Sequence, residues 1–213
     1  MRCFFITFET AGAPYHPDTQ VGSFSEVNDG ATNNPSCCYL YAMSTTNLPE
    51  VWLRGPVPGI SPILQPAVHA LLQARDEINE LMSQFPPNKI WERPAGVASA
   101  AFHLQHIRGV LDRLFTYAEG KPLSPDQLSQ LKEEGKQLEN GPTLQSLLDS
   151  LNRQVDESVD KMKRMEDGSL TEQRAVGRAQ LPSTVLGLLF HAAEHTMRHT
   201  GQLLVTVKVV LGG

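Results

Sequence analysis

Along most of the chain from residue 61 to residue 211, apolar residues return every three or four positions, and this spacing restricts what the chain can fold into. Side chains three or four residues apart share one face of an α-helix, whereas a half-buried strand buries every second residue. The first stretch illustrates the pattern with Leu64, Ala67, Val68, Leu71, Leu72, Ile78, Leu81 and Met82. The sequence therefore predicts a mainly helical protein.

Residues that begin or end helices divide this stretch. Ser61-Pro62 suits a helix start and Pro86-Pro87 a helix end, because proline fits the first turn but lacks the main-chain donor that a helix interior needs. Ser124 and Gln127 have the spacing of a capping box. Helices are accordingly predicted over residues 61–85, 97–118, 124–135, 143–167 and 182–211.

Four of these segments are long and amphipathic, and no segment after Met43 alternates with the period of a strand. Such helices bury their apolar faces best against one another. The predicted fold is an all-α, antiparallel four-helix bundle that occupies residues 43–213.

Residues 1–42 differ from the rest, because they are rich in Gly, Pro, Ser, Thr, Asn and Asp and follow neither period. Such a composition buries too little apolar surface to offset the entropy of ordering the chain. We expect either a disordered N-terminal extension or a stretch that precedes the true translation start at Met43. Cys3, Cys37 and Cys38 all lie here, and their spacing matches neither a disulfide framework nor a zinc knuckle.

The formal net charge of −5 at pH 7 narrows the classes of function. An acidic chain offers no basic surface for nucleic acid and no polybasic segment for an anionic membrane. No apolar run approaches the roughly 20 residues that span a bilayer. The apolar start of the chain is interrupted by Glu9 and lacks a small-residue cleavage site, which argues against a signal peptide. We therefore expect a cytoplasmic protein that binds neither nucleic acid nor membrane.

Five of the seven histidines fall in two short windows, His103 with His106, and His191 with His195 and His199. Residues four apart on a helix differ by only about 40° around its axis, so the second window forms a slanting row. His199 falls on the apolar stripe of its helix, His195 on the flank, and His191 nearer the polar edge.

Two imidazoles at this spacing can direct their nitrogens to one metal ion, about 2.0–2.1 Å from each. A third ligand would come from the second predicted helix, where His103 and His106 are the available donors. Burying several imidazoles without a metal would leave polar nitrogens that cost roughly 1–3 kcal/mol each. The pattern therefore predicts a site for one divalent metal ion, with an open position for water or a small-molecule substrate.

The other candidate residues have a structural interpretation as well as a functional one. A lone histidine on a helix is usually a surface group, and we prefer that interpretation for His191 because its angle leads away from the apolar stripe. Gln202 extends the row by one turn, and Asp112, Glu194 and Gln202 are candidates to orient the imidazoles or to be ordinary surface groups. The residue after His195 is Thr196, which excludes the His-Glu-x-x-His pattern of a zincin.

Three motifs resemble the DinB/YfiT superfamily of metal-binding four-helix bundles. They are Trp91-Glu-Arg-Pro94-Ala-Gly96, Ser99-Ala-Ala-Phe-His-Leu-Gln-His106-Ile107 and His195-Thr-Met-Arg-His199-Thr-Gly201-Gln202, and the resemblance spans roughly residues 63–211. It selects His106 over His103 and assigns His106, His195 and His199 as metal ligands, with His103, His191 and Gln202 as additional or neighbouring groups. Many members carry Glu and Arg where this chain has Thr196 and Thr200.

The resemblance also implies what the site would do. It implies zinc or nickel as the metal, frequent homodimers and, in some members, transfer of low-molecular-weight thiols or hydrolysis of amides. We favour a metal-dependent enzyme, either a thiol-dependent transferase or a hydrolase. The alternative is a non-catalytic binding module in which the metal joins two helices, and His103 would then be a fourth ligand that closes the site.

Overall fold

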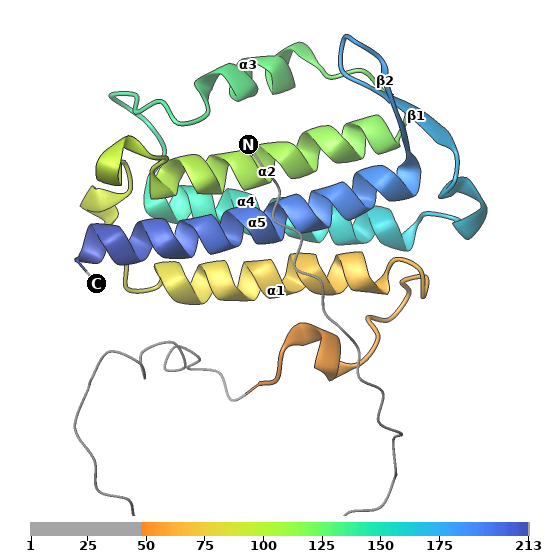
Figure 1. Cartoon of the computed structure of the whole chain (residues 1–213), viewed down its shortest axis with the longest axis horizontal. Coiled ribbons are helices and arrows are strands. Elements are labelled where there is room, and N and C mark those ends of the chain that lie inside the picture. Colours follow the sequence, from red (N-terminus) through yellow and green to blue (C-terminus); the bar gives the residue numbers. More distant parts are fainter. Residues whose placement is uncertain (1–47, 213) are drawn as a thin grey trace, which may run out of the picture. The chain divides into compact units, whose positions relative to one another are not determined.

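The computed structural model describes residues 48–212, so the predictions for residues 1–42, the three cysteines and Met43 lie outside the described part. Most of the described chain is helical, as predicted. The four long helices are α1 (Gln65–Met82), α2 (Ala100–Ala118), α4 (Leu144–Lys163) and α5 (Val185–Leu211), and they lie side by side (Figure 1). None of the helices in residues 48–212 is both long enough and apolar enough to cross a membrane.

Two pairs of neighbouring helices run in opposite directions. Arg75 on α1 donates to Asp156 on α4 at 2.6 Å, and Asn79 donates to Asn152 at 2.9 Å, so rising numbers on one helix meet falling numbers on the other. The histidine contacts described below relate α2 and α5 in the same way. These pairs have the antiparallel orientation that the sequence predicts.

The other two neighbouring pairs, α2 with α4 and α1 with α5, run parallel (Figure 1). Lys161 near the end of α4 contacts Glu119, just after the end of α2, at 2.6 Å. The parallel orientation arises because residues 119–143 form a long return segment rather than a tight turn between helices. The arrangement therefore differs from a bundle in which all neighbours are antiparallel.

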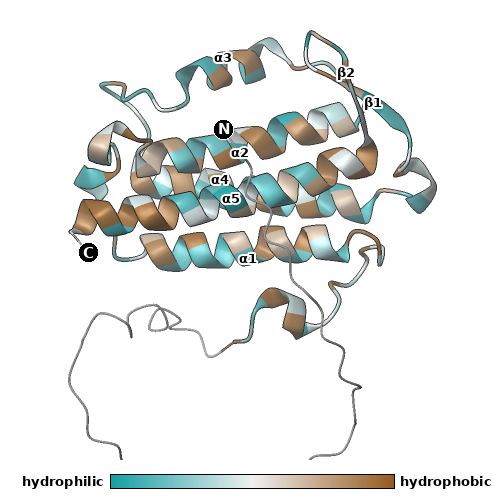
Figure 2. Cartoon of the chain, in the orientation of Figure 1, coloured by the Kyte–Doolittle hydropathy of each residue, from teal (hydrophilic) through white to brown (hydrophobic). Residues whose placement is uncertain are grey.

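The helices share one hydrophobic core. Its fully buried large side chains come from all four long helices and include Leu71, Ile78, Leu104, Leu111, Phe115, Leu151, Met162 and Leu189. Figure 2 shows that each long helix carries both hydrophobic and hydrophilic residues. Each such burial contributes about 1.5–3 kcal/mol relative to an exposed side chain, which is what holds the helices together.

A two-stranded hairpin precedes α5, contrary to the expectation of no strand after Met43. Strand β1 (Gln173–Val176) pairs antiparallel with β2 (Leu181–Thr184), and Pro182 lies opposite Ala175. Strands of four residues are too short to display a period, which is why the pattern missed them. Helix α5 consequently begins at Val185, capped by the Thr184 side chain, rather than at residue 182.

Helix α3 (Pro125–Glu133) lies on the outside of the molecule, next to α2 (Figure 1). Its predicted capping box is confirmed: the Ser124 side chain accepts from the Gln127 main chain, and the Gln127 side chain accepts from the Ser124 main chain. The remaining helical elements are short 3-10 turns at Val51–Arg54, Pro87–Lys89, Pro94–Gly96 and Asp167–Ser169.

Candidate metal centre

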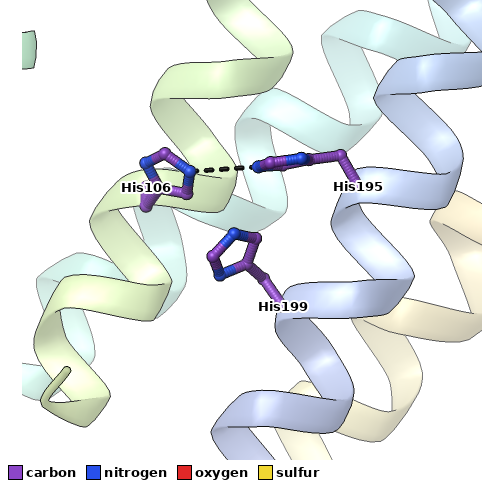
Figure 3. A group of neighbouring side chains, drawn as sticks. All are labelled: His106, His195 and His199. Atoms are coloured by element: carbon purple, nitrogen blue, oxygen red, sulfur yellow. Dashed lines mark hydrogen bonds between the residues drawn. The ribbon is translucent and has the colours of Figure 1, made fainter. Parts of the chain in front are cut away.

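Three histidines from two helices converge between α2 and α5. One ligand atom from each of His106, His195 and His199 lies within 4.8 Å of those of the other two. The Nε2 atoms of His106 and His195 are 3.0 Å apart, and the rings of His195 and His199 have centroids 4.6 Å apart (Figure 3). Helices α2 and α5 run antiparallel here, so residues far apart in the chain face one another.

The local sequence of α5 explains why two imidazoles face the same way. His195 and His199 are one turn apart, and the residues that follow each of them, Thr196 and Thr200, are buried on the core side of the helix. The threonine hydroxyls donate to main-chain carbonyls one turn earlier, at 2.7 and 2.9 Å. Thr196 and Thr200 therefore contribute to packing between the helix and the core.

A carboxylate contacts the outer nitrogen of His106. Glu134, just after α3, accepts from His106 Nδ1 through Oε2 at 2.7 Å, and Arg113 donates to its Oε1 at 2.6 Å. A metal-bound histidine usually donates its other ring N–H to such a group, which fixes the ring and its tautomer. His106 therefore has the hydrogen bonding of a ligand whose Nε2 carries no proton and can offer its lone pair.

A second imidazole contacts His199. The Nδ1 atoms of His103 and His199 are 3.1 Å apart, and His103 Nε2 lies 3.5 Å from the Thr206 hydroxyl. His103 is 3% exposed and does not belong to the converging group. With His199 Nδ1–H donating to His103 Nδ1, the other nitrogen of His199 remains available as a ligand. His103 thus supports His199 instead of joining the other three rings.

Burial keeps most of these rings neutral. Burial, followed by the nearby charge of His106, lowers the pKa of His103 to about 4. Burial, followed by the neighbouring histidines, lowers the pKa of His199 to about 4 and also lowers the pKa of His195. Neutral imidazoles carry the lone pairs that bind a metal ion.

The donor set fits a divalent cation. If Glu134 holds the Nδ1 proton of His106, the close contact between His106 Nε2 and His195 Nε2 can share only one proton. His195 Nδ1 is buried and has no hydrogen-bond partner among residues 48–212. A cation would satisfy several of the facing lone pairs at once, whereas hydrogen bonding alone leaves some unmatched.

The remaining predicted groups occupy other positions. Exposed His191 contacts Glu194 at 2.7 Å, and Glu194 also binds Arg198, so that Glu194 orients His191 rather than a member of the converging group. His191, Glu194 and His195 are themselves close enough to hold a metal, but this set shares His195 with the first one. Gln202 is exposed and lines a cavity of about 620 Å³ beside His103.

Glu134 and Arg113 were not among the residues singled out from the sequence. Glu134 lies 28 positions from its partner His106 in a short polar helix–turn segment, where acidic residues are ordinary. The only local signal is Gly135, which follows Glu134 and has a φ of +79°. Glycine at such a position marks a helix end without saying what precedes it.

Fold and site together define a class of mostly helical proteins with a three-histidine group between two helices. The chain matches the DinB superfamily over residues 70–203, more than half of its length and including all three histidines. The chain belongs to the DinB superfamily, and the resemblance noted in the sequence is confirmed.

A solved structure has the same fold. The crystal structure of a conserved protein from Enterococcus faecalis is similar to this chain, with a TM-score of 0.58 and 19% sequence identity. The similarity covers 72% of this chain and 99% of that one. Comparison with curated proteins gives no match.

Proposed function

We propose that this protein is a metal-dependent enzyme in which His106, His195 and His199 hold one divalent ion, zinc or nickel, and which acts on a small molecule. The observation that carries the proposal is the convergence of three imidazole nitrogens within 4.8 Å. A bound ion would act as a Lewis acid and would lower the pKa of a water or thiol ligand toward neutral pH.

The residues of the chain have separate tasks in this proposal. Glu134 and His103 hold the outer nitrogens of His106 and His199, so that the inner nitrogens stay oriented without a metal. Preformed ligands lose little freedom when an ion binds, which favours affinity. Phe102 stacks on His106 with ring centroids 5.1 Å apart and limits rotation of that ring.

An enzyme is favoured over a metal-stabilised binding module by the number of ligands. A structural zinc site usually has four protein ligands, whereas a catalytic site keeps an open position. The expected fourth ligand of a closed site was His103, whose Nδ1 instead faces His199 Nδ1 at 3.1 Å. Within the enzyme class we expect either thiol transfer or hydrolysis.

Metal analysis tests the first part of the proposal. We expect purified protein to bind one equivalent of zinc, nickel or cobalt, and a His195→Ala/His199→Ala variant to bind none. His69→Ala is the matched control, because His69 lies on α1, is not in the converging group and contacts the Gly55 carbonyl. Equal metal content in the double variant and the wild type would refute the three-histidine site.

Cobalt-substituted protein tests the reaction class. We expect a tetrahedral or five-coordinate cobalt spectrum that changes when a low-molecular-weight thiol is added, if the enzyme transfers thiols. A hydrolase would instead show a spectrum that changes with pH as a water ligand loses a proton. A spectrum unchanged over a range of thiols would count against transfer.

A further inference from the structure

We propose that Glu134 is a positioning residue that fixes His106 in the tautomer with Nδ1 protonated, leaving Nε2 free to face His195 and His199. Its importance for metal binding rests on the proposed function, but the tautomer itself does not. Glu134 comes from the return segment between α2 and α4, so this segment completes a site built mainly on α2 and α5.

Each oxygen of the Glu134 carboxylate has its own donor. Oε2 accepts from His106 Nδ1 at 2.7 Å and Oε1 accepts from Arg113 Nη1 at 2.6 Å. The three side chains are 8%, 19% and 10% exposed for Glu134, His106 and Arg113. An ionised carboxylate accepts hydrogen bonds and donates none, so His106 Nδ1 must carry the proton.

The backbone around this contact leaves room for it. Gly109 lies one turn before Arg113, and a Cβ there would be 2.6 Å from Arg113 Nη1 and closer still to Glu134 Oε1. On the other side, Gly135 has a φ of +79°, and a Cβ there would be 2.8 Å from Phe102 Cδ2. A side chain at position 109 would displace the Glu134 carboxylate, and one at position 135 would displace the ring of Phe102.

A further hydrogen bond fixes the segment that carries Glu134. The main-chain N–H of Gly135 donates to Gln105 Oε1 at 2.8 Å, and Gln105 precedes His106 on α2. The carboxylate is therefore held from two sides, by Arg113 and by the backbone of its own neighbour. Such support is what distinguishes a built contact from a chance surface pair.

The substitution Glu134→Gln tests the tautomer of His106 because Arg113 fixes the orientation of the new amide group. Arg113 only donates, so the glutamine carbonyl must face it and the amide NH₂ must face His106 Nδ1. The hydrogen bond to His106 is then reversed, and the ring must place its proton on Nε2. That proton lies on the nitrogen that a metal would bind.

Long-range ¹H–¹⁵N correlation spectra of histidine-labelled, metal-free protein report the tautomer of His106 directly. We expect protonated Nδ1 in the wild type and protonated Nε2 in Glu134→Gln. Adding Arg113→Met to Glu134→Gln frees the glutamine amide to rotate and to present its carbonyl to His106, so we expect part of the Nδ1–H form to return. Glu133→Gln is the matched control, because the Glu133 side chain is 47% exposed and pairs with Lys136 at 3.2 Å, away from His106; its spectrum should equal that of the wild type.

Zinc affinity, measured by competition with a chromophoric chelator, is the second readout. We expect Glu134→Gln to bind zinc about 10–100-fold more weakly than the wild type and Glu133→Gln to change the affinity less than about 2-fold. The variant that combines Glu134→Gln with Arg113→Met should recover part of the lost zinc affinity. A merely structural role of Glu134 would not produce this recovery.

The outcomes separate the two proposals. An Nδ1–H tautomer in Glu134→Gln, or an Nε2–H tautomer in the wild type, would overturn the role of Glu134 whatever the metal affinity. If the tautomers are as expected but the wild type binds no zinc, Glu134 still determines the tautomer of His106. The proposal of a metal-dependent enzyme would then be wrong. The tautomer of His106 in Glu134→Gln is by itself sufficient to support or overturn the role of Glu134.

Discussion

The three converging imidazoles differ in the group that contacts the outer side of each ring. His106 has the carboxylate of Glu134, His199 has the neutral ring of His103, and the buried Nδ1 of His195 has no partner in residues 48–212. A carboxylate makes a histidine more basic than a neutral acceptor does. His106 should therefore be the strongest ligand of the three and His195 the weakest.

Stability of the metal-free protein should depend on pH through the buried rings. The pKa of His103 is about 4 in the folded protein and about 6.5 when unfolded, so between these values the unfolded chain binds the extra proton. The free energy of unfolding has its full value above about pH 6.5 and falls as the pH drops toward 4. The ring of His103 accounts for about 3 kcal/mol of this decrease. Urea denaturation in the presence of a chelator measures it, and His103→Gln should flatten the curve while His69→Ala should not.

Two helical glycines should respond differently to substitution by alanine. Gly201 on α5 has nothing within 4 Å of an added Cβ, so Gly201→Ala should stabilise the protein by up to about 1 kcal/mol. Gly109→Ala gains the same helix propensity but displaces the Glu134–Arg113 pair, so we expect weaker zinc binding and no gain in stability. Thermal unfolding and chelator competition compare the two variants, and similar behaviour of both would contradict the tight contact at Gly109.

The three converging histidines are predictable from the sequence, His195 and His199 from their spacing and His106 from the family resemblance, whereas the groups that contact their outer nitrogens are not. Histidines four apart on an apolar stripe reveal a shared direction, because helix geometry is local. The contact between Glu134 and His106 depends on how a return segment folds back across α2, which no spacing along the chain encodes. The same holds for His103, which the sequence leaves as a possible fourth ligand and the fold places behind His199.

At the scale of the elements, α3 is attached by polar contacts and contributes no buried residue. Gln127 binds Thr116 on α2 at 2.8 Å, and Arg108 on α2 binds Gln130. Such an element opens at low free-energy cost compared with helices of the core. Helix α3 therefore delivers Glu134 while remaining the most easily displaced helix near the site.

Zinc should slow hydrogen exchange in α3. Coupling between two events is reciprocal, so if the Glu134 contact strengthens zinc binding 10–100-fold, zinc stabilises that contact by about the same factor. We expect amides of α3 to exchange faster than those of α4 in metal-free protein and to slow on zinc addition, as mass spectrometry would measure. The slowing should persist in Glu133→Gln and disappear in Glu134→Gln; slowing in both variants would show that zinc acts on α3 by another route.

Long helices were predictable and the connections between them were only partly so. The capping box at Ser124 and the apolar stripes are written in neighbouring residues, and both are confirmed. The hairpin at Gln173–Thr184 was missed, because its strands are short and Pro182 suggested a helix start. The parallel orientation of α2 and α4 depends on the path of residues 119–143, and the helical spacing of apolar residues gives no information about that path.

At the scale of the whole molecule, the histidine group links two helices that the chain order keeps apart. Helices α2 and α5 are separated by α3, α4 and the hairpin, yet they share both the core and the site. An ion bound by residues of both helices would bind the folded chain in preference to the unfolded one. Metal binding and folding are therefore expected to be coupled.

Zinc should consequently raise the unfolding temperature, by an amount that grows with the logarithm of its free concentration above the dissociation constant. Free zinc at about 100 times its dissociation constant stabilises the folded state by about 2.7 kcal/mol, which corresponds to a shift of roughly 5–10 °C for a chain of this size. Scanning calorimetry with and without zinc measures the shift, which should be kept in His69→Ala and lost in His195→Ala/His199→Ala. Because each variant is compared with its own metal-free form, a change in intrinsic stability does not enter, and an undiminished shift in the double variant would mean that zinc stabilises the protein from a different site.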